Sequence, residues 1–273
     1  MKVIAVTVVS GRHDHLAAQV RGLQNSTVEP AEHVVVSMGD NDIADVLARS
    51  GSRAVCVEMP AENPLPLARA RNIGAAAAVE RGAELLVFLD VDCIPGPELI
   101  ERYHCAATTL GNRRALLCGP VTYLKDADVG TEGAALALLT APHPARPNPP
   151  VGTVEFGENF DLFWSLSFAI DSATWSELGG FCEAYTGYGG EDTDFAATAE
   201  ASGIGLRWVG GAHAYHQFHP VSDPPVEHID DIVLNARTFF HRWGRWPMIG
   251  WLDAFAARGL VEFDGAGIRR TGT

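Results

Sequence analysis

The sequence predicts an α/β protein, with a mostly parallel sheet flanked by helices and a helical extension at its C-terminal end. Over residues 1–120, short apolar runs alternate with helical patterns, and such alternation favours a parallel sheet with right-handed crossovers. The apolar run Leu85–Leu89 ends abruptly in Asp90 and Asp92. A glycine-rich loop at 186–194, TGYGGEDTD, ends in three carboxylates. The last two features indicate where the sheet carries a functional site.

The first half of the chain divides into strands and helices by the period of its apolar residues. The expected strands are 3–9, 33–38, 54–57, 85–89 and 115–121, and the expected helices are 16–23, 43–48, 67–81 and 97–109. The opening run MKVIAVTVVS has one lysine but lacks a small-residue cleavage site. We therefore interpret it as the first buried strand and not as a signal peptide.

The second half changes character. Residues 141–150 contain five prolines, which exclude a helix or a central strand, so an exposed loop is expected there, either a plain connector or a lid. The remaining expected elements are a strand at 160–170, a short helix capped by Asp171 and ending at Gly179, a helix at 194–203, a strand at 205–209, and two amphipathic helices after Val226.

Composition restricts the classes of protein to which the chain can belong. Its 273 residues suffice for one large domain or two small ones that share a core, and no apolar run reaches membrane length. The five cysteines are odd in number and lack C-x-x-C spacing, which predicts reduced thiols in a cytoplasmic protein. A net charge of −14 argues against a nucleic-acid partner, although a small anionic substrate remains compatible if a metal ion and a few arginines neutralise it.

The carboxylates at the strand end and in the glycine loop suit a ligand site. Because side chains alternate along a strand, Asp90 and Asp92 can share one face at its carboxyl end, where open α/β sheets bind ligands. Two carboxylates there suit a divalent cation that keeps several waters and bridges to phosphates. Glycines at 187, 189 and 190 let a ligand approach the backbone closely. The alternative is an ordinary helix capped by aspartate after a flexible turn.

Four motifs in order resemble those of glycosyltransferases with the GT-A fold, within the large family 2 and its relatives. FLDVD at 88–92 resembles the metal-binding DxD, and GYGGED at 187–192 resembles the GWGGED signature of galactosyltransferases and N-acetylgalactosaminyltransferases. LARARNIGAAAA at 67–78 resembles the ARN-x-G helix, and AYHQ at 214–217 resembles a segment that supplies a histidine ligand. Two departures are Tyr188, where the signature has tryptophan, and VVSGR, where many relatives have a proline-containing turn.

The resemblance implies a Rossmann-like sheet and one GT-A domain in which successive segments have different roles. Residues 1–120 would bind the nucleotide-sugar donor, 121–220 would bind the acceptor and carry catalysis, and 221–273 would form the C-terminal helical extension. The implied donor-nucleotide site comprises Ser10, Arg12, Asp40, Arg71, Asp90 and Val91. Asp40 would recognise the base, expected to be uracil, while Asp90 would hold the ribose or a metal-bound water. The alternatives without a binding role are a turn cap for Asp40 and a solvated helix position for Arg71.

The resemblance also implies a bound Mn²⁺ or Mg²⁺. Asp92 would bind the cation and His216 would complete the site. His213 and His219 are rival ligands in the same histidine-rich stretch.

The implied reaction is transfer of a hexose or N-acetylhexosamine from a UDP-sugar to a hydroxyl of a carbohydrate or another acceptor. Asp192 would be the general base, Glu191 would bind acceptor hydroxyls, and Tyr188 and Trp164 would offer aromatic faces, although Trp164 could be plain core. A base opposite the leaving group implies inversion of configuration. The alternatives are a sugar-1-phosphate nucleotidyltransferase, a non-catalytic sugar-nucleotide-binding protein and a metal-dependent hydrolase.

Overall fold

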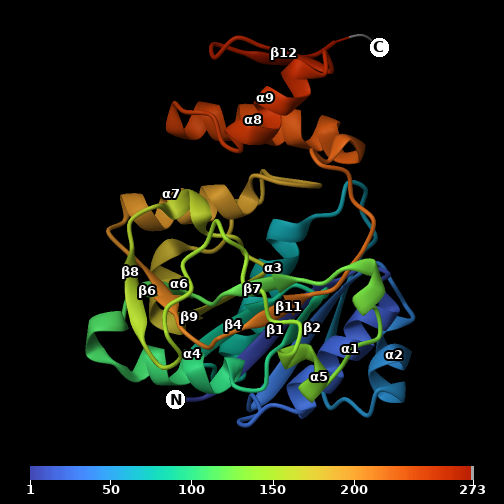
Figure 1. Ribbon diagram of the computed structural model, residues 1–273, viewed down its shortest axis with the longest axis vertical. Coiled ribbons are helices and arrows are strands. Elements are labelled where there is room, and N and C mark those ends of the chain that lie inside the picture. The colour runs from blue at the N-terminus through green and yellow to red at the C-terminus, as the bar shows by residue number, and fades with distance from the viewer. Residues whose placement is uncertain (272–273) are drawn as a thin grey trace.

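A computed structural model describes residues 1–271 and contains an eight-stranded sheet in the order β3-β2-β1-β4-β9-β6-β10-β8 (Figure 1). Its strands are β1 Val3–Val9, β2 Glu32–Met38, β3 Val55–Met59, β4 Leu85–Leu89, β6 Ala115–Cys118, β8 Val154–Gly157, β9 Ser167–Asp171 and β10 Gly205–Val209. Strands β1 to β4 pair in parallel, as do β6 and β10, whereas β9 runs antiparallel between β4 and β6, and β8 runs antiparallel at the edge. The mostly parallel sheet expected from the sequence is confirmed.

Helices cover both faces of this sheet. They are α1 His13–Gln24, α2 Ile43–Arg49, α3 Leu67–Glu80, α4 Leu99–Thr108, α6 Ser172–Leu178 and α7 Glu191–Ala201, whereas the short helix α5 Ala134–Ala137 packs against α1. On one face Val6 and Phe88 pack with side chains of α3, α6 and α7, and on the other face Val87 packs with α4. Helix α3 approaches the sheet closely because it has a glycine at 74, where a Cβ would lie 2.5 Å from Val6 Cγ1.

The strand expected at 115–121 is instead divided between two sheets. Strand β6 ends at Cys118, and β7 Val121–Tyr123 joins a three-stranded sheet with β11 Ala214–His216 and β5 Cys93–Pro95. The chain must turn between the two because Pro120 cannot donate to a ladder and a Cβ at Gly119 would lie 1.7 Å from the Ala212 carbonyl oxygen. This small sheet brings the end of β11 beside the residues that follow β4.

Two other expected elements differ in their bounds. The strand expected at 160–170 is confined to β9, because the Asn159 side chain accepts a hydrogen bond from the Asp161 N–H at 3.0 Å and closes a 3₁₀ turn over Phe160–Leu162. Helix α7 begins at Glu191 and not at residue 194, so the acids of the glycine loop lie in its first turn. The predicted cap of α6 is confirmed, since the Asp171 carboxylate accepts from the Thr174 N–H at 2.9 Å.

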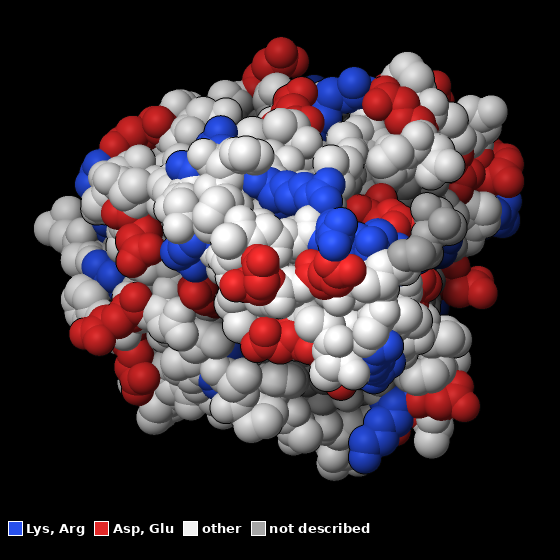
Figure 2. Space-filling model, turned by 90° about the horizontal axis from the view of Figure 1, so that it is seen from above, with Lys and Arg blue, Asp and Glu red and all other residues white. Residues whose placement is uncertain are grey.

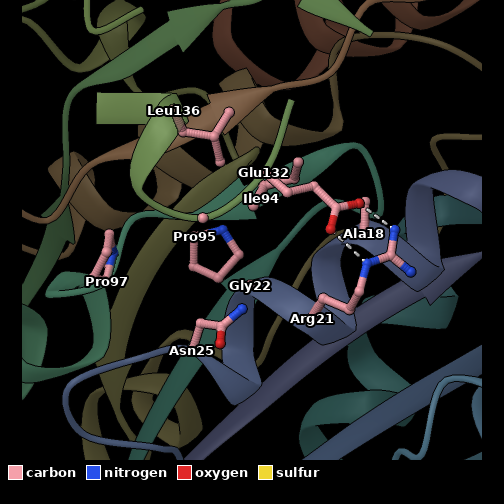
Figure 3. Close-up of a pocket in the computed structure, with 10 residues that line it drawn as sticks. Ala18, Arg21, Gly22, Asn25, Ile94, Pro95, Pro97, Glu132 and Leu136 are labelled. Atoms are coloured by element: carbon pink, nitrogen blue, oxygen red, sulfur yellow. Dashed lines mark hydrogen bonds and ion pairs between the residues drawn. The ribbon is translucent and has the colours of Figure 1, made fainter. Parts of the chain in front are cut away.

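The segment between β7 and β8 is anchored to the domain at two points. Figure 3 shows Leu136 in a small pocket against α1 and β5, beside an ion pair in which Arg21 Nε donates to Glu132 Oε2 at 2.8 Å. Further along, in the proline-rich loop, Arg146 is only 4% exposed, and its guanidinium lies 5.0 Å from the ring of Trp164 and 4.9 Å from that of Trp208. The loop is exposed over much of its length as expected, but this buried cation fastens it to the sheet.

The C-terminal extension forms a separate layer beyond α7 (Figure 1). It consists of α8 Ile229–Trp243, α9 Ile249–Ala257 and a hairpin of β12 Val261–Phe263 and β13 Ile268–Arg270, which surround their own apolar cluster. The two helices were expected and the hairpin was not. Viewed from this side, the molecule carries acidic and basic side chains intermixed (Figure 2).

Each of the five cysteines has a free thiol, as expected. Within residues 1–271, the helices are all too short or too polar to cross a membrane.

Candidate active site

The two acidic motifs meet at Arg71. This side chain projects from α3, is 4% exposed, and donates from Nη2 to Asp90 Oδ1 and from Nη1 to Glu191 Oε1, each at 2.9 Å. One buried guanidinium therefore joins the carboxyl end of β4 to the first turn of α7. Both of its terminal nitrogens are engaged by carboxylates, so Arg71 is not a solvated helix residue, and a direct contact with the nucleotide stays a prediction.

A candidate metal site lies where β11 passes the end of β4. Asp92, His216 and His219 each offer one ligand atom, and these atoms all lie within 4.8 Å of one another. The Nε2 atoms of both histidines are 3.5 Å from the Asp92 carboxylate. The backbone helps to hold this arrangement, since the Gln217 N–H donates to the Asp92 carbonyl oxygen at 2.7 Å. His219, considered only as a rival ligand from the sequence, stands with His216 in this group.

His213, the other rival, faces a different environment. Its Nε2 lies 2.8 Å from Thr122 Oγ1, and burial lowers the pKa of the imidazole to about 4. It is therefore a satisfied, neutral histidine within the small sheet.

The chemistry of the Asp92 group fits a divalent cation. Burial alone would raise the pKa of Asp92, but His219, His216 and Arg12 outweigh it and lower the pKa to about 2. An ionised carboxylate with two imidazoles is a donor set that binds divalent first-row metal ions, in which the carboxylate is the ligand type that Mn²⁺ favours. Arg12 also contacts this carboxylate, since its Nη1 lies 3.1 Å from Asp92 Oδ2, and its guanidinium adds a positive charge beside the group.

Asp40 ties together the loops that follow β1 and β2. Its Oδ2 accepts from the Gly11 N–H and contacts His13 Nε2, both at 2.8 Å, while its Oδ1 accepts from the Asp42 N–H at 3.0 Å. Burial opposes ionisation, but His13 and the two backbone N–H groups outweigh it and lower the pKa of Asp40. The contact to Asp42 is the turn cap that the sequence left open as an alternative. Recognition of a base by Asp40 stays a prediction.

The other two predicted donor residues lie beside the groups already described. Ser10 is half-buried in the loop after β1, and Val91 is buried between the two aspartates of the strand end. Their roles toward a nucleotide also stay predictions.

Asp192 occupies the first turn of α7, beside Glu191. Its Oδ1 accepts from the Thr193 N–H at 2.7 Å, and the side chain is half-buried. Burial, and then the negative charge of Glu191, raise the pKa of Asp192 to about 7. A carboxylate with this pKa can accept a proton at neutral pH far more readily than an ordinary aspartate. The N-cap of the helix is Gly190 at φ 94°, so the acids are not its caps.

The third carboxylate of the glycine loop serves the fold and not the site. Asp194 is 1% exposed, and its Oδ1 accepts from Tyr185 Oη at 3.0 Å and from Arg242 Nε and Trp243 Nε1 at 2.7 Å each. It connects α7 to α8, a contact that no sequence pattern indicated.

Aromatic side chains line an open cavity of about 850 Å³ beside the Asp92 group. Its walls include Tyr123, Tyr188, Val226 and the segment 216–222, which contains both candidate metal-binding histidines. Tyr188 is held by stacking on His228, with ring centroids 4.4 Å apart. The Tyr188 ring also stacks on Trp251 at a centroid distance of 5.9 Å, and the residue lines the same cavity as the metal group, while its role in acceptor binding stays a prediction.

Trp164 is connected to this cavity by a row of rings. Tyr123 lies 4.6 Å from His216, His143 lies 5.6 Å from Tyr123, and Trp164 lies 5.1 Å from His143, measured between ring centroids. Sequence analysis did not single out Tyr123, His143 or Arg146. His143 and Arg146 stand in the proline-rich loop, where composition predicts only an irregular backbone.

Comparison with known proteins supports a glycosyltransferase fold. Residues 154–220 match a family described as the N-terminal domain of galactosyltransferase. Validoxylamine A glucosyltransferase of Streptomyces hygroscopicus subsp. jinggangensis (strain 5008) is 27% identical over 202 residues, which cover 66% of this chain and 46% of that protein. Its counterpart in subsp. limoneus is 26% identical over 225 residues, 74% of this chain and 48% of that protein. The chain thus spans about half the length of these relatives.

Solved structures share the fold at low sequence identity. GalNAc-T7 with UDP, GalNAc and Mn²⁺ superposes with a TM-score of 0.59 at 14% identity, covering 94% of this chain and 57% of GalNAc-T7. Residues 1–349 of S. aureus TarS in complex with UDP give a TM-score of 0.58 at 13% identity, covering 88% of this chain and 66% of that fragment. The GT-A architecture expected from the four motifs is confirmed.

Proposed function

We propose that this chain, which has the GT-A fold and is related to galactosyltransferases, GalNAc-T7 and TarS, transfers a hexose or N-acetylhexosamine from a UDP-sugar to an acceptor hydroxyl. The observation that carries the proposal is Asp192, whose pKa is about 7, in a site where Arg71 joins Asp90 to Glu191. The relatives named as glucosyltransferases and the neighbour solved with UDP and GalNAc support UDP-glucose and UDP-N-acetylgalactosamine as the first donors to test.

The donor would lie over the carboxyl ends of β1, β2 and β4. Asp40, which accepts from the Gly11 N–H, would recognise the base, and Asp90, one of whose oxygens accepts from Arg71, would accept a hydrogen bond from a ribose hydroxyl. Arg12 offers its guanidinium beside Asp92, and guanidinium groups bind phosphate oxygens with charge-assisted hydrogen bonds. Ser10 and Val91 would line the same proposed donor site.

Asp92, His216 and His219 would hold Mn²⁺ or Mg²⁺. When bound there, such a cation supplies positive charge that offsets the charge developing on the leaving diphosphate. Arg12 contributes a fixed positive charge at the same carboxylate.

Asp192 would take the proton from the acceptor hydroxyl while the oxygen of that hydroxyl forms a bond to the anomeric carbon. The bond from that carbon to the UDP oxygen breaks, and the bonding electrons leave with UDP. Glu191 keeps one carboxylate oxygen on Arg71, and its other oxygen can accept a hydrogen bond from the acceptor. Because the base and the leaving group would lie on opposite faces, the product has inverted configuration.

The acceptor would occupy the aromatic cavity. Tyr188 and Tyr123 line it, and Trp164 stands at the far end of the ring row from His216. Aromatic faces pack against the apolar C–H faces of sugar rings, so this wall suits a carbohydrate or a cyclitol.

The test is UDP release from UDP-glucose, UDP-galactose and UDP-N-acetylgalactosamine, with Mn²⁺ or EDTA, in the presence and absence of a panel of sugars and aminocyclitols. We expect release that depends on acceptor, on cation and on Asp192, and a product of inverted anomeric configuration by NMR. Release that is equal with and without every acceptor would indicate a hydrolase. Formation of a UDP-sugar from UTP and a sugar 1-phosphate would indicate a nucleotidyltransferase, and binding without turnover would indicate a binding protein.

A further inference from the structure

We propose that helix α8 positions the catalytic loop, and that Asn235 and Asp231 hold the backbone of residues 186–190 so that Asp192 meets the acceptor hydroxyl. The inference rests on the proposed function and assigns to the C-terminal extension a role in the transfer step. Asp231 and Asn235 are four residues apart, so both side chains project from the same face of α8.

Asn235 gathers the loop through its side-chain amide. Its Nδ2 donates to the carbonyl oxygens of Gly189 at 2.7 Å, Thr186 at 2.9 Å and Tyr188 at 3.3 Å, and the residue is only 1% exposed. These three carbonyls belong to a loop that lies outside any helix or strand, so they have no partners in regular secondary structure. The amide has two hydrogens, so the three carbonyls share them, and without this donor these half-buried parts of the loop would lose their hydrogen bonds to α8.

Asp231 holds the same loop from the preceding turn of the helix. Its Oδ2 accepts from the Tyr188 N–H at 3.1 Å. The approach is so close that a Cβ at Gly187, which has φ +70°, would lie 2.2 Å from that oxygen. A glycine is therefore required at 187 by the contact with α8 as well as by its backbone conformation.

The C-terminal turn of α8 fixes the other side of the catalytic residue. Arg242 and Trp243 both donate to Asp194, two residues after Asp192. Helix α8 thus contacts the chain just before and just after Asp192, and together with Arg71, which holds Glu191, it constrains the first turn of α7.

Release of the loop would change how Asp192 titrates. The charged and titratable groups that face it are Glu191, Arg71, Asp90 and Tyr188. Loosening the backbone of Tyr188 and Gly189 admits water beside Asp192, and hydration favours the ionised carboxylate. A variant with a loosened loop should therefore have its base deprotonated at lower pH, whereas general destabilisation of a still-folded enzyme would not move this titration.

The test compares Asn235→Ala and the near-isosteric Asn235→Asp with Leu234→Ala, a control at a 53% exposed position on the same helix. We expect both Asn235 variants to lower kcat by about 10- to 100-fold, since a misplacement of about 1 Å can cost about 100-fold. In Asn235→Ala the acid limb of the pH–rate profile should move to lower pH, whereas in Asn235→Asp the added negative charge opposes that movement. In both variants amide exchange at Tyr188 should accelerate, and UDP affinity should change by less than about threefold.

A second pair keeps the proposal open to refutation if the Asn235 variants do not fold. Asp231→Ala removes the acceptor for the Tyr188 N–H, whereas Asp231→Asn retains one, so kcat should fall in the first and recover in the second. Folded variants with wild-type kcat, pH profile and amide exchange would overturn the inference while the enzyme stays a glycosyltransferase. Failure of the wild-type protein to transfer any sugar would overturn the proposed function and this inference with it.

Discussion

Asp192→Asn should make the protein less active and, at alkaline pH, more stable. The Asp192 carboxyl has a pKa of about 7 in the folded chain, against an ordinary value of 3.8. The folded state therefore holds this proton more tightly than the unfolded state. The associated stability is fully present below about pH 4 and is lost as pH rises through 7.

The magnitude follows from the two pKa values. Between pH 5 and pH 8 the unfolded carboxyl is ionised throughout, whereas the folded one changes from nearly fully protonated to mostly ionised. Integrating the difference in bound protons over this interval gives a loss of about 2–3 kcal/mol for the wild-type protein. Asparagine has no proton to lose, so the variant should gain this amount relative to the wild type over the same interval.

The assay is chemical denaturation of both proteins at pH 5 and pH 8, with activity measured in parallel. Wild-type transfer should rise by roughly tenfold from pH 6 to pH 8, because the deprotonated fraction of a group with a pKa of about 7 rises by that factor. Asp192→Asn should reduce transfer by roughly 10²–10⁴-fold with UDP affinity preserved. If the free energy of unfolding changes equally in the two proteins between pH 5 and pH 8, the raised pKa of Asp192 is refuted. Near-normal transfer by the variant would refute the role of Asp192 as the base.

Three further expectations concern metal binding and buried arginines. His216→Ala and His219→Ala should each weaken Mn²⁺ binding by at least about tenfold in calorimetry, whereas His213→Ala should not, and a larger loss at His213 would contradict the ligand set. Arg71→Met should lower the free energy of unfolding at pH 7 by about 3–5 kcal/mol in denaturant titrations, because it leaves two carboxylates without their buried partner. Arg146→Ala should lower it by less than about 2 kcal/mol, because loss of two aromatic contacts and side-chain packing is partly offset by removal of a guanidinium whose three nitrogens are buried without a hydrogen-bond partner, and a gain in stability would mean that these contacts do not fasten the proline-rich loop.

The local pattern of apolar and charged residues was sufficient to predict most of the sheet and the position of Asp90 and Asp92 at the end of one strand. Strand β4 was predicted with its bounds, and so was the placement of Asp90 and Asp92 after it, because an apolar run that stops at charged residues is a property of neighbours in the chain. The strand expected at 115–121 was wrong because its division depends on the close approach of residue 212 to Gly119, nearly a hundred positions away.

The sequence by itself determined which residue types the site would contain, and the tertiary structure alone decided how they are grouped. His213, His216 and His219 are equivalent by spacing, and the pairing of β11 with β5 and with β7 places two of them at Asp92 and the third at Thr122. Arg71 and Glu191 are 120 residues apart, yet they share an ion pair. Likewise, nothing in the pattern of α8 indicates that it holds the glycine loop. Such contacts are made between segments that folding brings together, so their partners cannot be inferred from periodicity along one segment.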